Sequence, residues 1–306
     1  MRNTLVNTLL TQSENDEKIA FLTADLGFMA VEPLAEKLGK RFINCGVAEA
    51  NMIGVAAGLS IVGYTPFLYT MAPFITMRCL EQIRVSLCQN KHKVVLIGVA
   101  AGYSYGSQGA SHHAIEDLAP MLALPEMTVI VPSDPLDVRN ALLALKEIDG
   151  PVYMRLAKAG EPNLAPEDRS FKLGKIATMV DGNDASVFVT GDILAKVLNV
   201  AKRLKVEGFN IGVYNCHTLK PFDSTFVAEV AAKTMKVFTV EQHVLHGGLS
   251  TLVSLALSKS KIPMDVIEFL TIKDRYIKTV GEKETLEAMD GLSEDGIYQS
   301  ILKELM

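Results

Sequence analysis

The 306-residue sequence is long enough for two domains of ordinary size. Its 49% hydrophobic and 21% charged residues allow a large buried core and exclude a disordered chain. The formal net charge of −5, without a run of lysine or arginine, argues against nucleic acid as a partner. The four cysteines form no C-x-x-C pair, the N-terminus has no signal-peptide pattern, and no apolar run reaches membrane length. We therefore expect a cytoplasmic protein that does not enter membranes.

The first half of the sequence alternates between apolar strands and helices. Strands are predicted at residues 19–23, 41–45, 63–69, 94–99, 128–131 and 152–156. Helices are predicted at residues 4–11, from 49, at 74–88, from 114 and from 135 to 149. The last of these has an aspartate cap followed by proline at its first position. Apolar strands that alternate with helices indicate a parallel sheet covered on both faces.

A polar stretch at residues 159–172, with one glycine and two prolines, is typical of a linker. Beyond it the alternation continues in a smaller unit, with strands predicted at residues 186–190, 211–214, 237–240 and 266–269. The sequence therefore predicts an α/β fold of two doubly wound, mostly parallel-sheet domains, residues 1–165 and 166–306.

Glu49 begins a predicted helix whose sequence, EANMIGVAAGL, is built of small and apolar residues. A helix that is apolar on all sides is buried, and a buried carboxylate is costly without a partner. The segment has no basic residue after Arg41. We expect the partner to be a ligand, which would make the chain an enzyme subunit. The alternative is a glutamate satisfied by the N–H groups and dipole of its own helix.

Polar residues also follow other predicted strands, where the ligands of doubly wound sheets bind. The sequence predicts a polar site at this edge from Asp25, Glu49, His112, His113 and Arg155.

The two adjacent histidines end a long glycine-rich loop at residues 102–113. Long ordered loops are often functional, but a histidine in such a loop is also commonly structural, and both roles stay open. A metal site is not expected, because adjacent histidine side chains diverge and no third ligand lies nearby. His243 and His246 have an H-x-x-H spacing, yet a loop that turns into a helix at Gly247 explains them better.

Four motifs occur in order along the chain: GVAEANM at residues 46–52, GASHHAIE at 109–116, PSD at 132–134 and TVEQH at 239–243 with GGL at 247–249. Together they resemble the C-terminal half of a split, two-subunit transketolase, whose patterns are G-[IV]-A-E-Q-N-M, G-x-[ST]-H-Q-x-[IV]-E, P-x-D and T-V-E-[ED]-H with GGLG. The resemblance implies a pyrimidine-binding (Pyr) domain followed by a transketolase C-terminal domain.

The resemblance implies that the ligand of Glu49 is thiamine diphosphate. In the family this glutamate hydrogen-bonds N1′ of the aminopyrimidine ring, which lets the ring's amino group take the proton from C2 of the thiazolium. Phe74 corresponds to a residue that packs on the pyrimidine. Asp25 corresponds to an aspartate on the rim of the cofactor and substrate site.

The resemblance also implies the substrate side of the site. His112 corresponds to a histidine that contacts donor oxygens and moves protons, and His113 lies beside it. Arg155 corresponds to an arginine that meets a sugar phosphate.

The sequence lacks G-x-x-x-x-G-K-[ST], G-x-G-x-x-G after a strand, and the Gly-Asp-Gly with a downstream asparagine that holds diphosphate and Mg²⁺ in thiamine enzymes. The resemblance therefore implies an N-terminal-half partner subunit that holds the diphosphate and Mg²⁺. Active sites would lie between the chains of an α2β2 assembly. Gly54 and Gly58 would allow a close helix approach at such an interface.

Several substrate-facing positions depart from the family pattern. Phe28 and Met29 stand where small hydroxyl residues are usual, Ala50 and His113 each replace glutamine, and Met71 replaces phenylalanine. We therefore expect transfer of a two-carbon ketol unit with a non-standard sugar, such as an unphosphorylated, deoxy or nucleotide-linked one.

Three alternatives remain. The beta subunit of a 2-oxoacid dehydrogenase shares the architecture but has a different histidine loop. A deoxyxylulose-phosphate-synthase-like enzyme normally carries both halves on one chain. A non-catalytic scaffold subunit could keep the fold without the chemistry.

Overall fold

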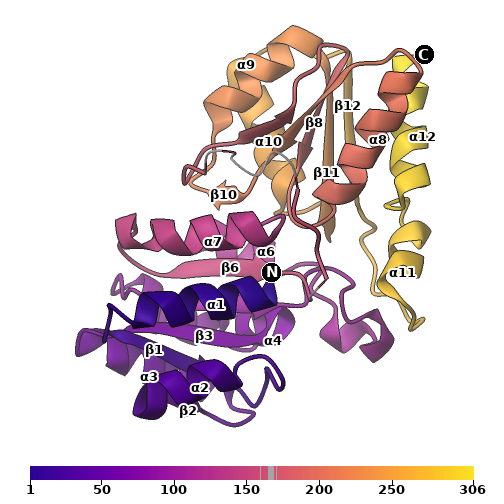
Figure 1. Cartoon of the computed structure of the whole chain (residues 1–306). Coiled ribbons are helices and arrows are strands. Elements are labelled where there is room, and N and C mark those ends of the chain that lie inside the picture. The colour runs from indigo at the N-terminus through magenta and orange to yellow at the C-terminus, as the bar shows by residue number, and fades with distance from the viewer. Residues whose placement is uncertain (159, 165–168, 170) are drawn as a thin grey trace.

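The computed structural model describes residues 1–158, 160–164, 169 and 171–306, which form two stacked α/β units (Figure 1). The predicted boundary between residues 165 and 166, and part of the predicted linker, lie outside the described residues. Within the described residues, no helix has both the length and the apolar character needed to cross a membrane.

The first sheet has seven strands in the order β10-β5-β6-β4-β3-β1-β2. All its pairings are parallel except that of β10 with β5. The strands are β1 (Ile19–Thr23), β2 (Phe42–Asn44), β3 (Thr65–Met71), β4 (Val95–Val99), β5 (Thr128–Ile130), β6 (Val152–Leu156) and β10 (Thr218–Lys220).

Successive strand residues alternate between two hydrophobic clusters, as the pleat requires. One face packs against α1 (Arg2–Ser13), α2 (Glu32–Leu38) and α7 (Pro135–Ala144). The other face packs against α3 (Glu49–Ile61), α4 (Ala72–Met77), α5 (Leu80–Gln82), a π-helical segment (Ile83–Cys88) and α6 (Leu118–Ala123). This sheet is therefore covered on both faces, as the apolar strands predict.

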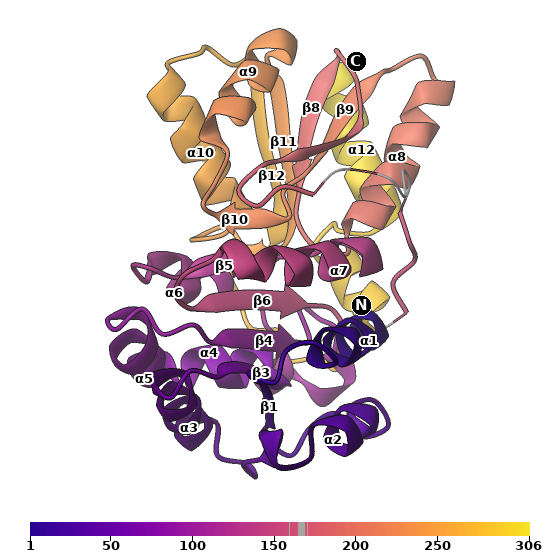
Figure 2. The ribbon, with the colours of Figure 1, turned by 60° about the vertical axis from the view of Figure 1, so that its left-hand side comes forward.

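The second sheet has five strands in the order β12-β11-β8-β9-β7, of which only β7 is antiparallel. They are β7 (Ala177–Val180), β8 (Ala185–Val189), β9 (Ile211–Asn215), β11 (Lys236–Val244) and β12 (Val266–Ile272). Helices α9 (Ser224–Thr234) and α10 (Leu249–Ser260) cover one face (Figure 2). Helices α8 (Leu194–Val206), α11 (Lys283–Met289) and α12 (Glu294–Leu305) belong to the other. The predicted fold class is confirmed.

Two predicted helices differ from the structure. The helix predicted at residues 74–88 is broken after Met77, and its parts are α4, α5 and the π-helical segment. The helix predicted from residue 114 begins only at Leu118. Ala114 cannot start it, because its N–H and C=O are paired with the C=O and N–H of Gly102, at 3.0 and 2.9 Å. The predicted cap of α7 is confirmed, since the Asp134 side chain accepts from the N–H of Asp137 at 2.9 Å.

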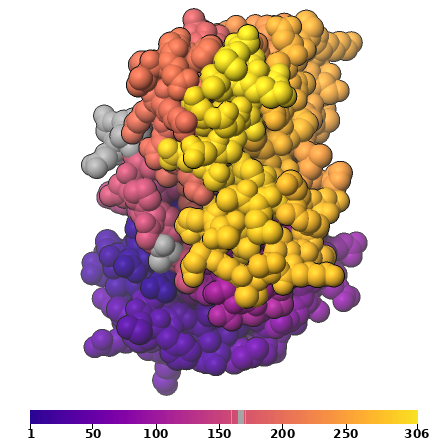
Figure 3. All heavy atoms as spheres, turned by 90° about the vertical axis from the view of Figure 1, so that its right-hand side faces the viewer, coloured from indigo at the N-terminus to yellow at the C-terminus, as the bar shows by residue number. Residues whose placement is uncertain are grey.

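The two units are joined more closely than a linker between domains would suggest. Strand β10 comes from the second half of the chain but extends the first sheet, which the sequence analysis did not predict. A C-terminal segment, residues 273–290, also lies over the loop at 102–117 (Figure 3). There Tyr276 donates to Glu116 at 3.1 Å and Tyr103 donates to Asp290 at 2.8 Å.

A buried ion pair lies at this junction. The guanidinium of Arg155, on β6, is 1% exposed and donates to the Asp117 carboxylate at 2.9 to 3.1 Å. It also donates to the carbonyls of Ala114 at 2.6 Å and of Gln242, on β11, at 2.9 Å. Tyr153 donates to the same carboxylate at 2.5 Å. Burial opposes the charge on Arg155, but Asp117 raises its pKa overall.

Replacement of Asp117 by alanine would leave the guanidinium of Arg155 buried without its counter-charge. We expect Asp117→Ala to lower the free energy of unfolding by about 3–5 kcal/mol, measured by urea denaturation. Glu116→Ala is the matched control, because this neighbouring carboxylate makes a solvent-exposed contact to Tyr276, and we expect a loss of about 1 kcal/mol or less. Equal losses in the two variants would show that the buried pair is not the main link.

Candidate functional site

The carboxyl ends of β4, β3, β1 and β2 lie side by side in the first sheet, at an edge that we call the rim. Four of the predicted site residues follow these strands: Asp25 after β1, Glu49 after β2, Phe74 in α4 after β3, and His112 in the loop after β4. Parallel strands end at the same edge, so the topology brings residues from distant parts of the sequence together.

Glu49 is the first residue of α3 and is 2% exposed. Its Oε2 accepts a hydrogen bond from Nη1 of Arg78 at 2.7 Å. The guanidinium-bearing side chain of Arg78 is 49% exposed and follows the last residue of α4. The local segment contains no base, as the sequence shows, but the fold supplies one from 29 residues further along the chain. The expectation that the partner is absent from the chain is therefore corrected.

Arg78 also connects Glu49 to two other predicted residues. Its guanidinium carbon lies 4.6 Å from the ring centroid of Phe74. The Phe74 ring in turn meets the edge of the His112 ring, with centroids 5.2 Å apart at 69°. Ser111 Oγ lies 3.0 Å from Nδ1 of the same histidine. Glu49, Arg78, Phe74 and His112 thus form one continuous cluster, which we call the rim row.

Asp25 lies on the rim but is paired with a different residue. Asn44, at the end of β2, donates through Nδ2 to Asp25 Oδ1 at 3.1 Å. Its Oδ1 accepts from the backbone N–H groups of Asp25 at 3.1 Å and Gly46 at 3.0 Å. The backbone of Asp25 is left-handed, with φ of 54°, and so is that of Ala100 after β4, with φ of 77°. Such positions are strained in non-glycine residues and concentrate at functional sites.

His113 and Arg155 are not brought to the rim row. His113 is 3% exposed and packs edge-on against Tyr103, with ring centroids 5.0 Å apart. Burial lowers its pKa, and its Nε2 has no hydrogen-bond partner among the described residues. Arg155 is held by Asp117 and two carbonyls, as described above. Both placements differ from the predicted contact with substrate, because these side chains are committed to packing inside the chain.

Two polar residues of the rim were not predicted. Asn44 ends a short strand and belongs to no motif. Lys158 is exposed two residues beyond the end of β6, and its ammonium lies 4.7 Å from the ring centroid of Tyr105. A search for cations just past strand ends, rather than within strands, would have favoured Lys158 over Arg155.

The H-x-x-H pair does not form a site. His243 lies within β11 rather than in the predicted loop, is fully buried, and its Nδ1 contacts the carbonyl of Val244 at 2.7 Å. His246 is exposed in the following turn. Across the described part of the chain, no three histidine, cysteine or carboxylate side chains are grouped so that they could hold a metal ion.

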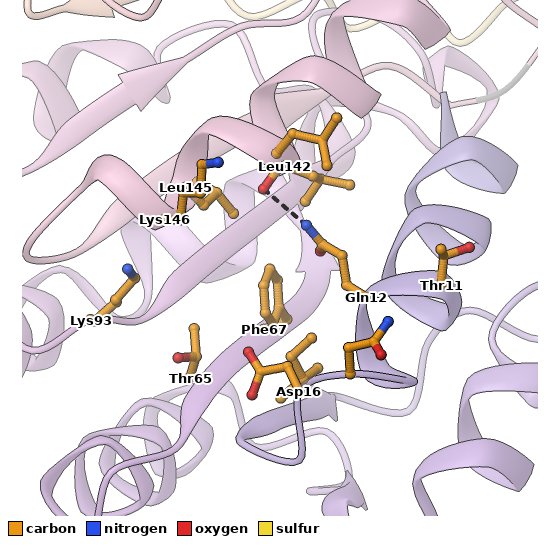
Figure 4. Close-up of a pocket in the computed structure, with 12 residues that line it drawn as sticks. Thr11, Gln12, Asp16, Thr65, Phe67, Lys93, Leu142, Leu145 and Lys146 are labelled. Carbon is orange, nitrogen blue, oxygen red and sulfur yellow. Dashed lines mark hydrogen bonds between the residues drawn. The ribbon is translucent and has the colours of Figure 1, made fainter.

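A larger hollow lies at the opposite edge of the same sheet, where β1 and β3 begin (Figure 4). It has a volume of about 450 Å³ and is bordered by Gln12, Phe67, Lys93 and Lys146. The cavity at the rim, beside Asp25 and Asn44, has only about 140 Å³. Ligands of parallel α/β sheets bind at carboxyl ends, so we place the site at the rim. Pockets for drug-sized ligands have about 300–1,000 Å³, so the rim needs a second wall to enclose a cofactor.

Comparisons with known proteins agree with this placement. Residues 1–161 match the family model described as transketolase, pyrimidine binding domain, and residues 174–297 match that of the transketolase C-terminal domain. The chain is 31% identical to one of the two apulose-4-phosphate transketolase subunits of Phocaeicola vulgatus, over 99% of this chain and 96% of the relative. It is 35% identical to the 6-deoxy-6-sulfo-D-fructose transketolase subunit SqwH of a Clostridium species, over 85% and 81%.

A solved structure described as a split gene transketolase, inactive beta4 tetramer, superimposes with a TM-score of 0.88 at 35% identity, covering 99% of this chain and 97% of that one. The relatives matched along nearly their whole length are thus themselves single subunits. The chain belongs to the transketolase family, as the subunit of a split transketolase that carries the pyrimidine-binding and C-terminal domains.

Proposed function

We propose that the rim row is this chain's half of an active site that transfers a two-carbon ketol unit between sugars, and that Glu49 holds the aminopyrimidine of thiamine diphosphate. The observation that carries the proposal is the buried carboxylate of Glu49, which lies on the rim beside the partly buried ring of Phe74. A carboxylate beside an aromatic face fits a planar ring that carries hydrogen-bond donors.

The chain's own residues divide the work. Glu49 would accept a hydrogen bond from the ring, and Phe74 would pack on one of its faces. His112, half-buried at the end of the row, would hold or move a proton on the substrate oxygens. Asp25 and Lys158 would bind polar groups of the sugar at the exposed part of the rim. When bound, thiamine diphosphate supplies the carbanion chemistry.

We further propose that an N-terminal-half subunit completes the site and holds the diphosphate and Mg²⁺, in an α2β2 assembly. The small rim cavity and the missing phosphate motif support this. So does the solved relative, since that tetramer of beta chains is described as inactive. The four free cysteines fit a reducing cytoplasm.

Helix α3 offers a surface for the partner. Gly54 and Gly58 are exposed, and a Cβ placed at either would meet no heavy atom of the described chain within 4 Å. A glycine inside a helix costs about 0.5–1 kcal/mol relative to alanine, and nothing within the described chain requires that cost. Val47, Ile61 and Val62 are exposed apolar residues at the two ends of the same helix. Close contact with a second chain would explain both features.

The sugar is proposed to be non-standard. Phe28 and Met29, which replace small hydroxyl residues, are 72% and 93% exposed next to the rim. Two relatives are named for apulose 4-phosphate and for 6-deoxy-6-sulfo-D-fructose. Exposed apolar side chains in place of hydroxyls would weaken binding of an ordinary sugar phosphate.

Glu49→Gln keeps the shape of the side chain but removes the carboxylate. We expect kcat/KM of the complex with its partner to fall by about 10²–10⁴-fold, while subunit association stays intact. The matched control is Glu294→Gln, an exposed glutamate in the first turn of α12, which should leave the rate unchanged. Full activity of Glu49→Gln in an intact complex would support the scaffold alternative.

Substrate choice is tested in the same reconstituted complex. We expect xylulose 5-phosphate with ribose 5-phosphate to react poorly, because the hydroxyl residues that usually meet the sugar phosphate are replaced. Steady-state kcat/KM against a panel of phosphorylated, deoxy and nucleotide-linked sugars measures this. Turnover of the standard pair at about 10⁴ M⁻¹s⁻¹ or more, the ordinary range for enzymes, would contradict a non-standard substrate.

Gly54→Leu adds a bulky side chain to the exposed face of α3. We expect the affinity for the partner to fall by about tenfold or more, equivalent to about 1.4 kcal/mol, measured by analytical ultracentrifugation. The helix itself should not be weakened, because leucine favours helices more than glycine does. Lys202→Leu, at an exposed position of α8, is the control. Unchanged association in Gly54→Leu would exclude this face from the interface.

A further inference from the structure

Arg78 makes the two contacts that the proposed function assigns to the aminopyrimidine. Its planar guanidinium donates to the Glu49 carboxylate at 2.7 Å and lies over the Phe74 ring at 4.6 Å from the centroid. We propose that Arg78 occupies the place of the aminopyrimidine in the subunit without its partner, and must leave Glu49 before the cofactor is held. This inference rests on the proposed function of Glu49 and Phe74.

The exposures of the paired residues show which one can give way. Glu49 is 2% exposed and fixed in the first turn of α3, whereas the Arg78 side chain is 49% exposed. Arg78 also directly follows the end of α4, where the predicted long helix is broken. The guanidinium therefore reaches Glu49 from the open side of the rim, and its removal exposes the carboxylate without unpacking the core.

The exchange cannot be driven by deprotonation of Arg78, because a guanidinium stays charged at any physiological pH. It requires a replacement donor for the carboxylate, since a buried carboxylate without a partner is costly. The aminopyrimidine ring would be that donor. Arg78 therefore keeps Glu49 satisfied in the free subunit and lowers the apparent affinity for the cofactor by competing with it.

The test is calorimetric titration of thiamine diphosphate into the reconstituted complex in the presence of Mg²⁺. We expect Arg78→Ala to bind the cofactor about three- to tenfold more tightly than wild type, as expected for loss of a partly exposed competing ion pair. Arg84→Ala, the control, removes an exposed arginine of the π-helical segment, six positions further along the chain. It should change the Kd less than twofold. Weaker or unchanged binding in Arg78→Ala would overturn the inference.

A second variant guards against loss of packing at Phe74. Arg78→Met keeps an apolar stem over the ring but removes the donor to Glu49, and it should also bind the cofactor more tightly than wild type. The gain from Arg78→Ala should disappear when Glu49 is also replaced by alanine, because there is no longer a carboxylate to compete for. A gain that persists in the double variant would contradict competition at Glu49.

The Glu49→Ala variant separates this inference from the proposed function. If Glu49→Ala binds the cofactor and turns over like wild type, the proposed function fails. If Glu49→Ala loses activity but Arg78→Ala shows no gain in affinity, only the role of Arg78 fails.

Discussion

The buried carboxylate of Glu49 is the constraint on which the account of this protein depends. The helix behind it, α3, packs its apolar face into the core and fixes the carboxylate at the rim. Such a group needs a donor in every state of the molecule. In the chain alone that donor is Arg78, and in the assembled enzyme it is proposed to be the cofactor. The need for a constant partner thus connects folding of the subunit to loading of the site.

The second sheet helps to hold the loop that carries His112. The loop is closed at its base by the pairing of Gly102 with Ala114, and Arg155 joins that base to β11. On its outer side it is covered by the C-terminal segment, where a Cβ at Gly106 would meet the carbonyl oxygen of Gly281 at 2.5 Å. The C-terminal domain therefore has a structural role at the rim although it contributes no member of the rim row.

Local patterns predicted the parts of the structure that local interactions decide. Apolar strands, the Asp134 cap and the all-apolar helix after Glu49 are readable because burial and capping depend on nearby residues. The pairing of Glu49 with Arg78 and of Arg155 with Asp117 could not be read, because these partners lie 29 and 38 positions apart in the sequence. Strand β10 escaped prediction for the same reason, since so short a strand gives no period and its partner strand is in the other half of the chain.

The most direct measurement is a structure of this chain with its partner subunit, thiamine diphosphate and Mg²⁺, at a resolution that shows side chains. The account predicts that the Glu49 carboxylate lies within hydrogen-bond distance of N1′ of the pyrimidine ring. It also predicts that the Phe74 ring packs on that pyrimidine and that the Arg78 guanidinium has moved away. A pyrimidine bound elsewhere, with Arg78 still paired to Glu49, would contradict the central claim.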